Sequence, residues 1–160
     1  MNYETSLEIE LAIANWFGIQ KYVIVPNLSY ALLPYECDLA ILSKAGYLYE
    51  IEIKVSRSDL IRDKKKHKWN YDTNKIKKLW FAIPEKLEDV IELIPEKAGI
   101  LIVKSSVYVS EIKKPQTDNL AQKMSERQQF TIARVGAMRI WALKEALIKK
   151  SKTPPVATIT

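Results

Sequence analysis

The 160-residue chain has a length typical of one domain, and its 48% hydrophobic content is sufficient for a packed core. It carries 25 Lys and Arg residues against 19 Asp and Glu residues, and the net charge of +6 favours an anionic partner, nucleic acid first and an anionic membrane surface second. The single cysteine (Cys37) and single histidine (His67) exclude an internal disulfide, a cysteine-rich zinc site and a multi-histidine metal site. No stretch is long and apolar enough to cross a bilayer, and the acidic start does not resemble a signal peptide, so we expect a cytoplasmic protein.

The first predicted element is an amphipathic helix from Thr5 to Phe17 that ends at Gly18. Thr5 and Glu8 have the spacing of a capping box, in which each residue bonds the backbone of the other. Apolar residues recur at helical spacing and predict its packing face: Leu7, Leu11 and Ala14.

Strands and helices then alternate along the chain. The predicted strands cover residues 21–25, 36–42, 47–55, 78–83, 99–103 and 107–109, and Pro26-Asn27 is expected to end the first of them. Ser56 predicts the N-cap of a basic helix that reaches about Trp69, and residues 86–93 predict a short helix. This alternation is typical of an α/β fold, with a mixed central sheet flanked by helices.

Asp118 predicts the start of a long C-terminal helix that reaches Lys149. We expect residues 1–150 to form a single domain and residues 151–160 a flexible tail. Trp80, Phe81 and Trp141 are expected in the core. The predicted packing side of the long helix consists of Leu120, Met124, Val135, Met138, Ile140, Trp141 and Leu147.

The chemistry-bearing pattern is the strand at 47–55, where Glu50, Glu52 and Lys54 alternate with apolar residues and therefore share one face. If the strand that carries Asp38 lies beside it, two carboxylates and an ammonium converge. Two carboxylates can hold Mg²⁺, which prefers oxygen ligands, and a neighbouring ammonium can stabilise developing negative charge. The alternative is a half-exposed strand with a solvated charged face, because the same alternation describes both.

The order of these elements, with Asp38 and Glu52-Ile53-Lys54 in place, resembles the PD-(D/E)xK nuclease superfamily. A closer resemblance, over residues 5–148, is to the MmcB-like family of DNA-repair proteins. It is carried by the runs at residues 52–64, 68–71 and 80–84, which read EIKVSRSDLIRDK, KWNY and WFAIP. The resemblance implies a restriction-endonuclease-like core and metal-dependent cleavage of DNA.

In this interpretation Asp38 and Glu52 would be metal ligands, the main-chain carbonyl of Ile53 could supply a third oxygen, and Lys54 would lie near the scissile phosphate or attacking water. The metal would be Mg²⁺ or Mn²⁺. The alternative for Asp38 is a turn residue. The alternative for Glu52 and for Lys54 is an ion pair with a residue on a neighbouring strand, which contributes only ~0.2–1 kcal/mol to stability if it is exposed.

Additional acidic site candidates are Glu8, Glu50, Asp59 and Asp63. Each has a structural alternative, such as a capping role for Glu8 and Asp59. Glu50 could bind a second metal or could simply be a solvent-facing charge. His67 could shuttle a proton, but a lone histidine in a lysine-rich helix is more often a surface residue.

A basic cluster follows the candidate site and predicts contacts with a phosphate backbone, whereas a solvated helix face is the alternative. Two aromatic residues within it could stack on unpaired bases or pack in the core. The nucleic-acid-binding candidates are Arg57, Arg62, Lys64, Lys65, Lys66, Lys68, Trp69 and Tyr71.

The sequence therefore predicts a magnesium-dependent deoxyribonuclease, endo- or exonucleolytic, that serves DNA repair or recombination. The first alternative is a DNA-binding module that keeps the nuclease fold without turnover. A second alternative is a basic structural or interaction subunit, which would require an exposed apolar surface. The expected partner is DNA rather than a membrane, and a homodimer would suit paired cuts.

Overall fold

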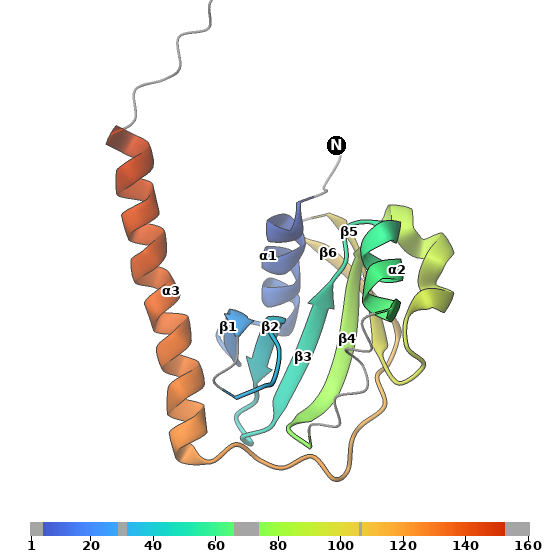
Figure 1. The fold of residues 1–160 in the computed structure, drawn as a ribbon, viewed down its shortest axis with the longest axis horizontal. Helices are drawn as coiled ribbons and strands as arrows, with labels where there is room; N and C mark the ends of the chain where they lie inside the picture. Colours follow the sequence, from blue (N-terminus) through green and yellow to red (C-terminus); the bar gives the residue numbers. More distant parts are fainter. Residues whose placement is uncertain (1–4, 29–31, 66–73, 106, 153–160) are drawn as a thin grey trace, which may run out of the picture.

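A six-stranded mixed sheet forms the centre of the computed structural model, which describes residues 5–28, 32–65, 74–105 and 107–152 (Figure 1). The β3–β4 and β4–β5 pairs are parallel and the other pairs are antiparallel. The strands lie side by side in chain order: β1 (Val23–Leu28), β2 (Cys37–Leu42), β3 (Leu48–Ile53), β4 (Ile76–Pro84), β5 (Gly99–Ser105) and β6 (Tyr108–Lys113). The predicted α/β class is confirmed, and the arrangement is consistent with a restriction-endonuclease-like core.

Helices cover the two faces of this sheet. Helix α1 (Ser6–Phe17) packs on one face against β3 to β6, and the 3-10 helix η2 (Glu85–Leu93) packs against β4 and β5 on the other. Helix α2 (Arg57–Lys65) follows β3 and contacts η2. The predicted capping box of α1 is confirmed, and the Ser56 hydroxyl caps α2 by accepting the Asp59 N–H at 3.2 Å.

The packing face predicted for α1 is wrong. The side chains of Ile9, Ala12 and Ile13 face the sheet and are buried, whereas Leu7 and Leu11 are 69% and 57% exposed. The helix has apolar residues on both sides, so periodicity alone could not identify the buried one. A surface helix usually carries polar residues on its outer side, whereas α1 carries Leu7 and Leu11 there.

Strand β1 continues through the residues that were expected to end it. Pro26 pairs with Leu39 inside the strand, and Asn27 adopts a left-handed backbone with φ of 49°. Proline is tolerated here because β1 lies at the edge of the sheet, where an unpaired side of the strand needs no N–H donor.

The C-terminal helix α3 (Glu126–Lys152) begins eight residues later than predicted. The chain before it runs along the ends of the strands and donates backbone hydrogen bonds to distant carbonyls, including those of Lys97, Lys77 and Gly46 (Figure 1). Two of the donors, the N–H groups of Gln122 and Met124, are ones that a helix starting at Asp118 would need for its own hydrogen bonds. Ser125 then caps α3, because its hydroxyl accepts the Gln128 N–H at 3.3 Å while the Gln128 side chain accepts the Ser125 N–H at 2.8 Å.

Only part of the predicted packing side of α3 contacts the rest of the described chain. Ile132 is buried against β1, and a Cβ placed on Gly136 would lie 3.0 Å from Val25 Cγ2, so helix and strand approach closely. Met124 is buried and Val135 partly buried, as predicted. The prediction is wrong for five residues, which are exposed: Leu120, Met138, Ile140, Trp141 and Leu147.

The core prediction is confirmed for Trp80 and Phe81, which are 5% and 1% exposed, and wrong for Trp141, which is 64% exposed. Ser151 and Lys152 belong to α3, and the remainder of the predicted tail lies outside the described residues. Within the described ranges, no helix combines the length and hydropathy needed to cross a membrane.

Candidate active site

The charged row of β3 is buried, so it is not the solvated face that the sequence left open. Glu50, Glu52 and Lys54 are 4%, 0% and 7% exposed. Strand β3 lies inside the sheet, between antiparallel β2 and parallel β4, and both of its faces are covered. Burying charged groups is costly unless they are paired, so their partners define the site.

The three predicted catalytic side chains come together at the end of β3. Lys54 Nζ lies 3.0 Å from Glu52 Oε2 and 4.0 Å from Asp38 Oδ2. The Asp38 Oδ2 atom also accepts the main-chain N–H of Ile53 at 2.8 Å. One ammonium therefore contacts two carboxylates. The Glu52 side chain is fully buried, and the Asp38 side chain is 33% exposed.

Strand register produces this convergence. Leu39 pairs with Ile51 and Ala40 with Glu50, so continuing the antiparallel register places Asp38 opposite Glu52. One residue beyond β3, the Lys54 N–H donates to the carbonyl of Ala82 on β4 at 3.0 Å. The site is thus held by three neighbouring strands, at the end of the sheet where α2 begins.

A third acid, which the sequence interpretation missed, belongs to this region. Burial and, secondarily, the negative charge of Asp38 raise the pKa of Glu10 on α1. The predicted first-helix candidate, Glu8, instead completes the capping box, where its Oε2 atom accepts the Thr5 N–H at 3.3 Å. The sequence did not single out Glu10, because its place beside Ile9 and Ile13 matters only once that face is known to be the buried one.

Glu50 forms a separate buried arrangement. The hydroxyl of Tyr35 donates to Glu50 Oε2 at 2.6 Å. Burial, followed by the charge of Glu50 and this hydrogen bond, raises the pKa of Tyr35 far above its usual range, so the hydroxyl stays protonated and remains a donor. The expectation of a solvent-facing Glu50 is wrong, because the loop before β2 covers it.

Two of the nucleic-acid-binding candidates, Arg57 and Arg62, are exposed and form surface ion pairs. Arg57 Nη1 lies 3.6 Å from Asp89, and Arg62 contacts Asp59, the residue at the third position of α2. Such exposed pairs contribute little to stability, ~0–1 kcal/mol, so they can exchange for a phosphate at small cost. The contacts of Asp59 are local to α2 and do not bring it to Asp38.

Several sequence predictions fall beyond the described part of the chain. Lys66, His67, Lys68, Trp69 and Tyr71 lie there entirely. The side chains of Asp63, Lys64 and Lys65 also lie outside the description, although α2 includes their backbone.

The two carboxylates of the site are the type of ligand that a magnesium ion prefers. Mg²⁺ is commonly held by one or two carboxylates, with water and substrate phosphate oxygens completing its shell. Asp38 and Glu52 supply two carboxylates that contact one common atom, Lys54 Nζ. Among the described residues, no group of three or more His, Cys, Asp and Glu side chains could hold a metal, so water and phosphate would have to supply the remaining oxygens.

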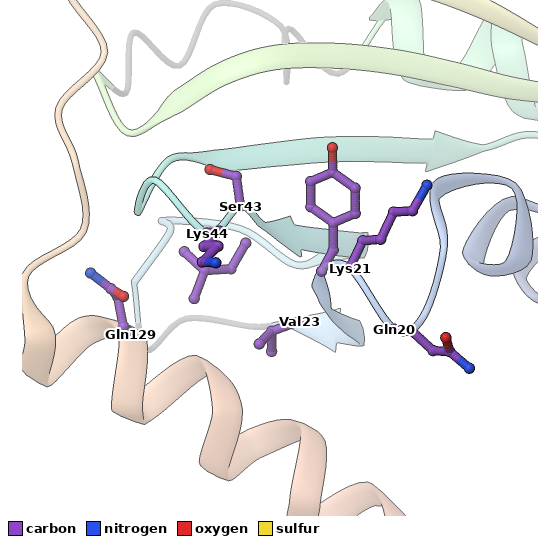
Figure 2. Close-up of a pocket in the computed structure, with 8 residues that line it drawn as sticks. Gln20, Lys21, Val23, Ser43, Lys44 and Gln129 are labelled. Atoms are coloured by element: carbon purple, nitrogen blue, oxygen red, sulfur yellow. The ribbon is translucent and has the colours of Figure 1, made fainter.

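A separate hollow of about 290 Å³ lies at the opposite end of β2, beside the start of α3 (Figure 2). Its lining includes two lysines and no carboxylate: Gln20, Lys21, Tyr22, Val23, Leu42, Ser43, Lys44 and Gln129. This hollow can accept an anion but lacks the carboxylate that usually holds Mg²⁺ in proteins. The candidate active site is therefore the Asp38 end of β2.

Residues 2–147 match the family model described as "DNA repair protein MmcB-like". The chain belongs to the MmcB-like family. Its resemblance to that family, based on the runs after Glu52, is confirmed, and the family description indicates a role connected with DNA.

The fold of this MmcB-like chain is similar to the solved structure of the SPO1766 protein of unknown function from Silicibacter pomeroyi. The TM-score is 0.65 at 17% sequence identity, over 98% of this chain and 99% of that chain. This likeness supports the fold alone. A comparison with curated proteins gave no match.

Proposed function

We propose that this MmcB-like chain is a metal-dependent deoxyribonuclease of the PD-(D/E)xK type that acts in DNA repair or recombination. The observation that carries the proposal is the contact of one ammonium, Lys54 Nζ, with the carboxylates of Asp38 and Glu52, at 4.0 Å and 3.0 Å. Asp, Glu and Lys in this relation are the donor set of a phosphodiester-cleaving site, and the family description supports DNA as the substrate.

In the proposed reaction Asp38 and Glu52 would hold Mg²⁺ or Mn²⁺, with the Ile53 carbonyl as a further candidate ligand. A bound divalent ion would supply Lewis acidity and lower the pKa of a coordinated water. Lys54 stabilises negative charge at the phosphate oxygens or orients the attacking water, because its ammonium is fixed by two carboxylates. Glu10 lies within electrostatic reach of Asp38 and is the additional acid of the site.

The DNA would be held by the basic residues next to the site. Arg57 and Arg62 are exposed on α2 directly after β3, and the net charge of +6 favours association with a polyanion. The two lysines of the hollow at the other end of β2, Lys21 and Lys44, offer a second phosphate contact. Binding should weaken steeply with salt, because each phosphate contact releases counterions.

One observation favours the alternative, a DNA-binding module without turnover. The Lys54 ammonium already neutralises Glu52 in the buried pair, so the site is stable as a salt bridge. In that case metal would add nothing, and the basic surface would account for the whole function.

The test is an assay with end-labelled single-stranded, duplex, flap and junction DNA, with Mg²⁺ or Mn²⁺ and with chelator. The proposal predicts cleavage that requires metal and is lost in Lys54→Ala, assayed below the temperature at which that variant begins to unfold. The matched control is Lys114→Ala, which removes an exposed lysine far from the site in sequence. If wild type and Lys54→Ala both bind DNA and neither cleaves any substrate, the protein is a binding module instead.

A further inference from the structure

The C-terminal half of α3 is apolar and exposed. Beyond Arg139, whose Nη2 donates to the Asn27 carbonyl at 2.9 Å, the helix extends past β1, the strand on which it packs (Figure 1). Six large side chains in this half of the helix are more than half exposed: Met138, Ile140, Trp141, Leu143, Leu147 and Ile148. Ile140, Leu143 and Leu147 recur three and four residues apart and therefore share one side of the helix, and we call these three residues the α3 apolar surface. An exposed apolar stripe along one side of a helix is typical of an interaction site in a folded protein.

A second apolar surface lies on α1. Leu7 and Leu11 are separated by one helical turn on the side of α1 opposite Ile9 and Ile13, and they are 69% and 57% exposed. We call these two leucines the α1 apolar surface. Helices pack through residues at this spacing, so a second helix can lie against it.

The charges around the two surfaces are opposite. Helix α1 contains two acidic residues, Glu8 and Glu10, and no basic residue. The segment of α3 from Met138 to Lys152 contains five basic residues against one acidic residue, a net charge of +4. Pairing α3 with α3 of another copy would bring like charges together, whereas pairing α3 with α1 brings opposite charges together.

We propose that the protein forms a twofold homodimer in which the α3 apolar surface of each chain packs against the α1 apolar surface of its partner. A twofold axis makes the contact reciprocal, so both exposed surfaces of both chains are covered at once. This arrangement also explains why α1 carries apolar residues on its outer side and why α3 extends beyond its own sheet. The inference does not depend on nuclease activity.

The first experiment measures the mass of the full chain in solution by light scattering and sedimentation, from about 1 to 100 μM, in low and high salt. The proposal predicts a dimer whose Kd rises several-fold as salt increases, because screening weakens the attraction between the helices. A monomer throughout this range, or a dimer that tightens with salt, would overturn it.

Substitutions then identify the two surfaces. Leu143→Glu on α3 and Leu11→Glu on α1 should each raise the Kd at least tenfold without changing the melting temperature of the monomer, because both side chains are exposed. The matched control is Leu120→Glu, at an exposed leucine outside both surfaces, which should leave the Kd unchanged. A dimer that is weakened by Leu143→Glu but not by Leu11→Glu would contradict the assignment of α1 as the partner.

Disulfide trapping separates contacts between chains from contacts within one chain. Mixing a Leu11→Cys protein with a Leu143→Cys protein should give a covalent heterodimer under mild oxidation, while the buried Cys37 stays reduced. Crosslinking only between two Leu143→Cys chains would indicate α3–α3 pairing. A chain that carries both substitutions, forms an internal disulfide and gives no dimer in solution would show that α3 folds onto its own α1. Either of these two results would refute the proposal.

Discussion

Replacing Lys54 with methionine tests whether the site is a buried ion pair. The change removes the ammonium 3.0 Å from Glu52 Oε2 but keeps a long apolar side chain in its place. The side chains of Lys54 and Glu52 are 9% and 0% exposed, so water cannot replace the lost partner. Breaking a buried pair in this way costs about 3–5 kcal/mol. For a domain of this size each kcal/mol lowers the melting temperature by roughly 2–4 °C, so the melting temperature of Lys54→Met should fall by ~6–20 °C.

Thermal and urea unfolding, followed by circular dichroism, measure this loss. The double variant Glu52→Gln/Lys54→Met should recover most of it, because the uncompensated charge is then absent. The control Lys114→Met, at an exposed lysine, should change stability by no more than about 0.5 kcal/mol. A loss below about 1 kcal/mol in Lys54→Met, as in an exposed surface pair, would refute the buried-pair reasoning.

Three further variants test other parts of the structure by the same unfolding measurements. Because the pKa of Glu10 is raised, the folded state binds its proton more tightly than the unfolded chain, and wild-type stability falls as pH rises through that pKa. Glu10→Gln should therefore be more stable than wild type at pH 7 and lose this advantage in acid. An equal difference in stability at every pH would contradict this reasoning. Tyr35→Phe leaves the buried Glu50 carboxylate without its 2.6 Å hydrogen bond and should cost about 1–3 kcal/mol, and no measurable loss would mean that another donor replaces the hydroxyl. Gly99→Ala places a Cβ 2.5 Å from Trp80 Cδ1 and should destabilise the domain by at least about 1–3 kcal/mol, whereas a neutral result would show that the indole can move.

The sequence predicted the strands and the convergence of Asp38, Glu52 and Lys54, because alternation and order along the chain determine both. It could not determine whether the charged row faced water. That depended on β3 being an inner strand, paired with β2 and with parallel β4, and on the loop carrying Tyr35 covering Glu50.

Tertiary context also decided which helix faces were buried. Glu8 and Glu10 are equally acidic in sequence, yet in the fold Glu8 completes the capping box, whereas Glu10 flanks the buried side of α1 and is influenced by the charge of Asp38. Apolar residues on the outside of α1 and α3 were assigned to the core because hydropathy does not distinguish a core contact from a surface for another chain. The helix predicted from Asp118 does not form there because the N–H groups of Gln122 and Met124, which its first turns would need, bond the carbonyls of Asn74 and Gly46.

The cleavage rate of the Asp38→Asn variant tests most directly whether Asp38 belongs to a metal-dependent phosphodiesterase site. The substitution keeps size and shape at a side chain that is one-third exposed, so the protein should remain folded. We expect the Mg²⁺- or Mn²⁺-dependent cleavage rate to fall at least about 100-fold. Mutating residues that only support a metal ligand typically lowers metal affinity or activity by about 10–100-fold, and losing the ligand itself should cost at least as much. Asp118→Asn, at an aspartate far from the site in sequence, should cleave at the wild-type rate. Equal cleavage by wild type and Asp38→Asn would contradict the account.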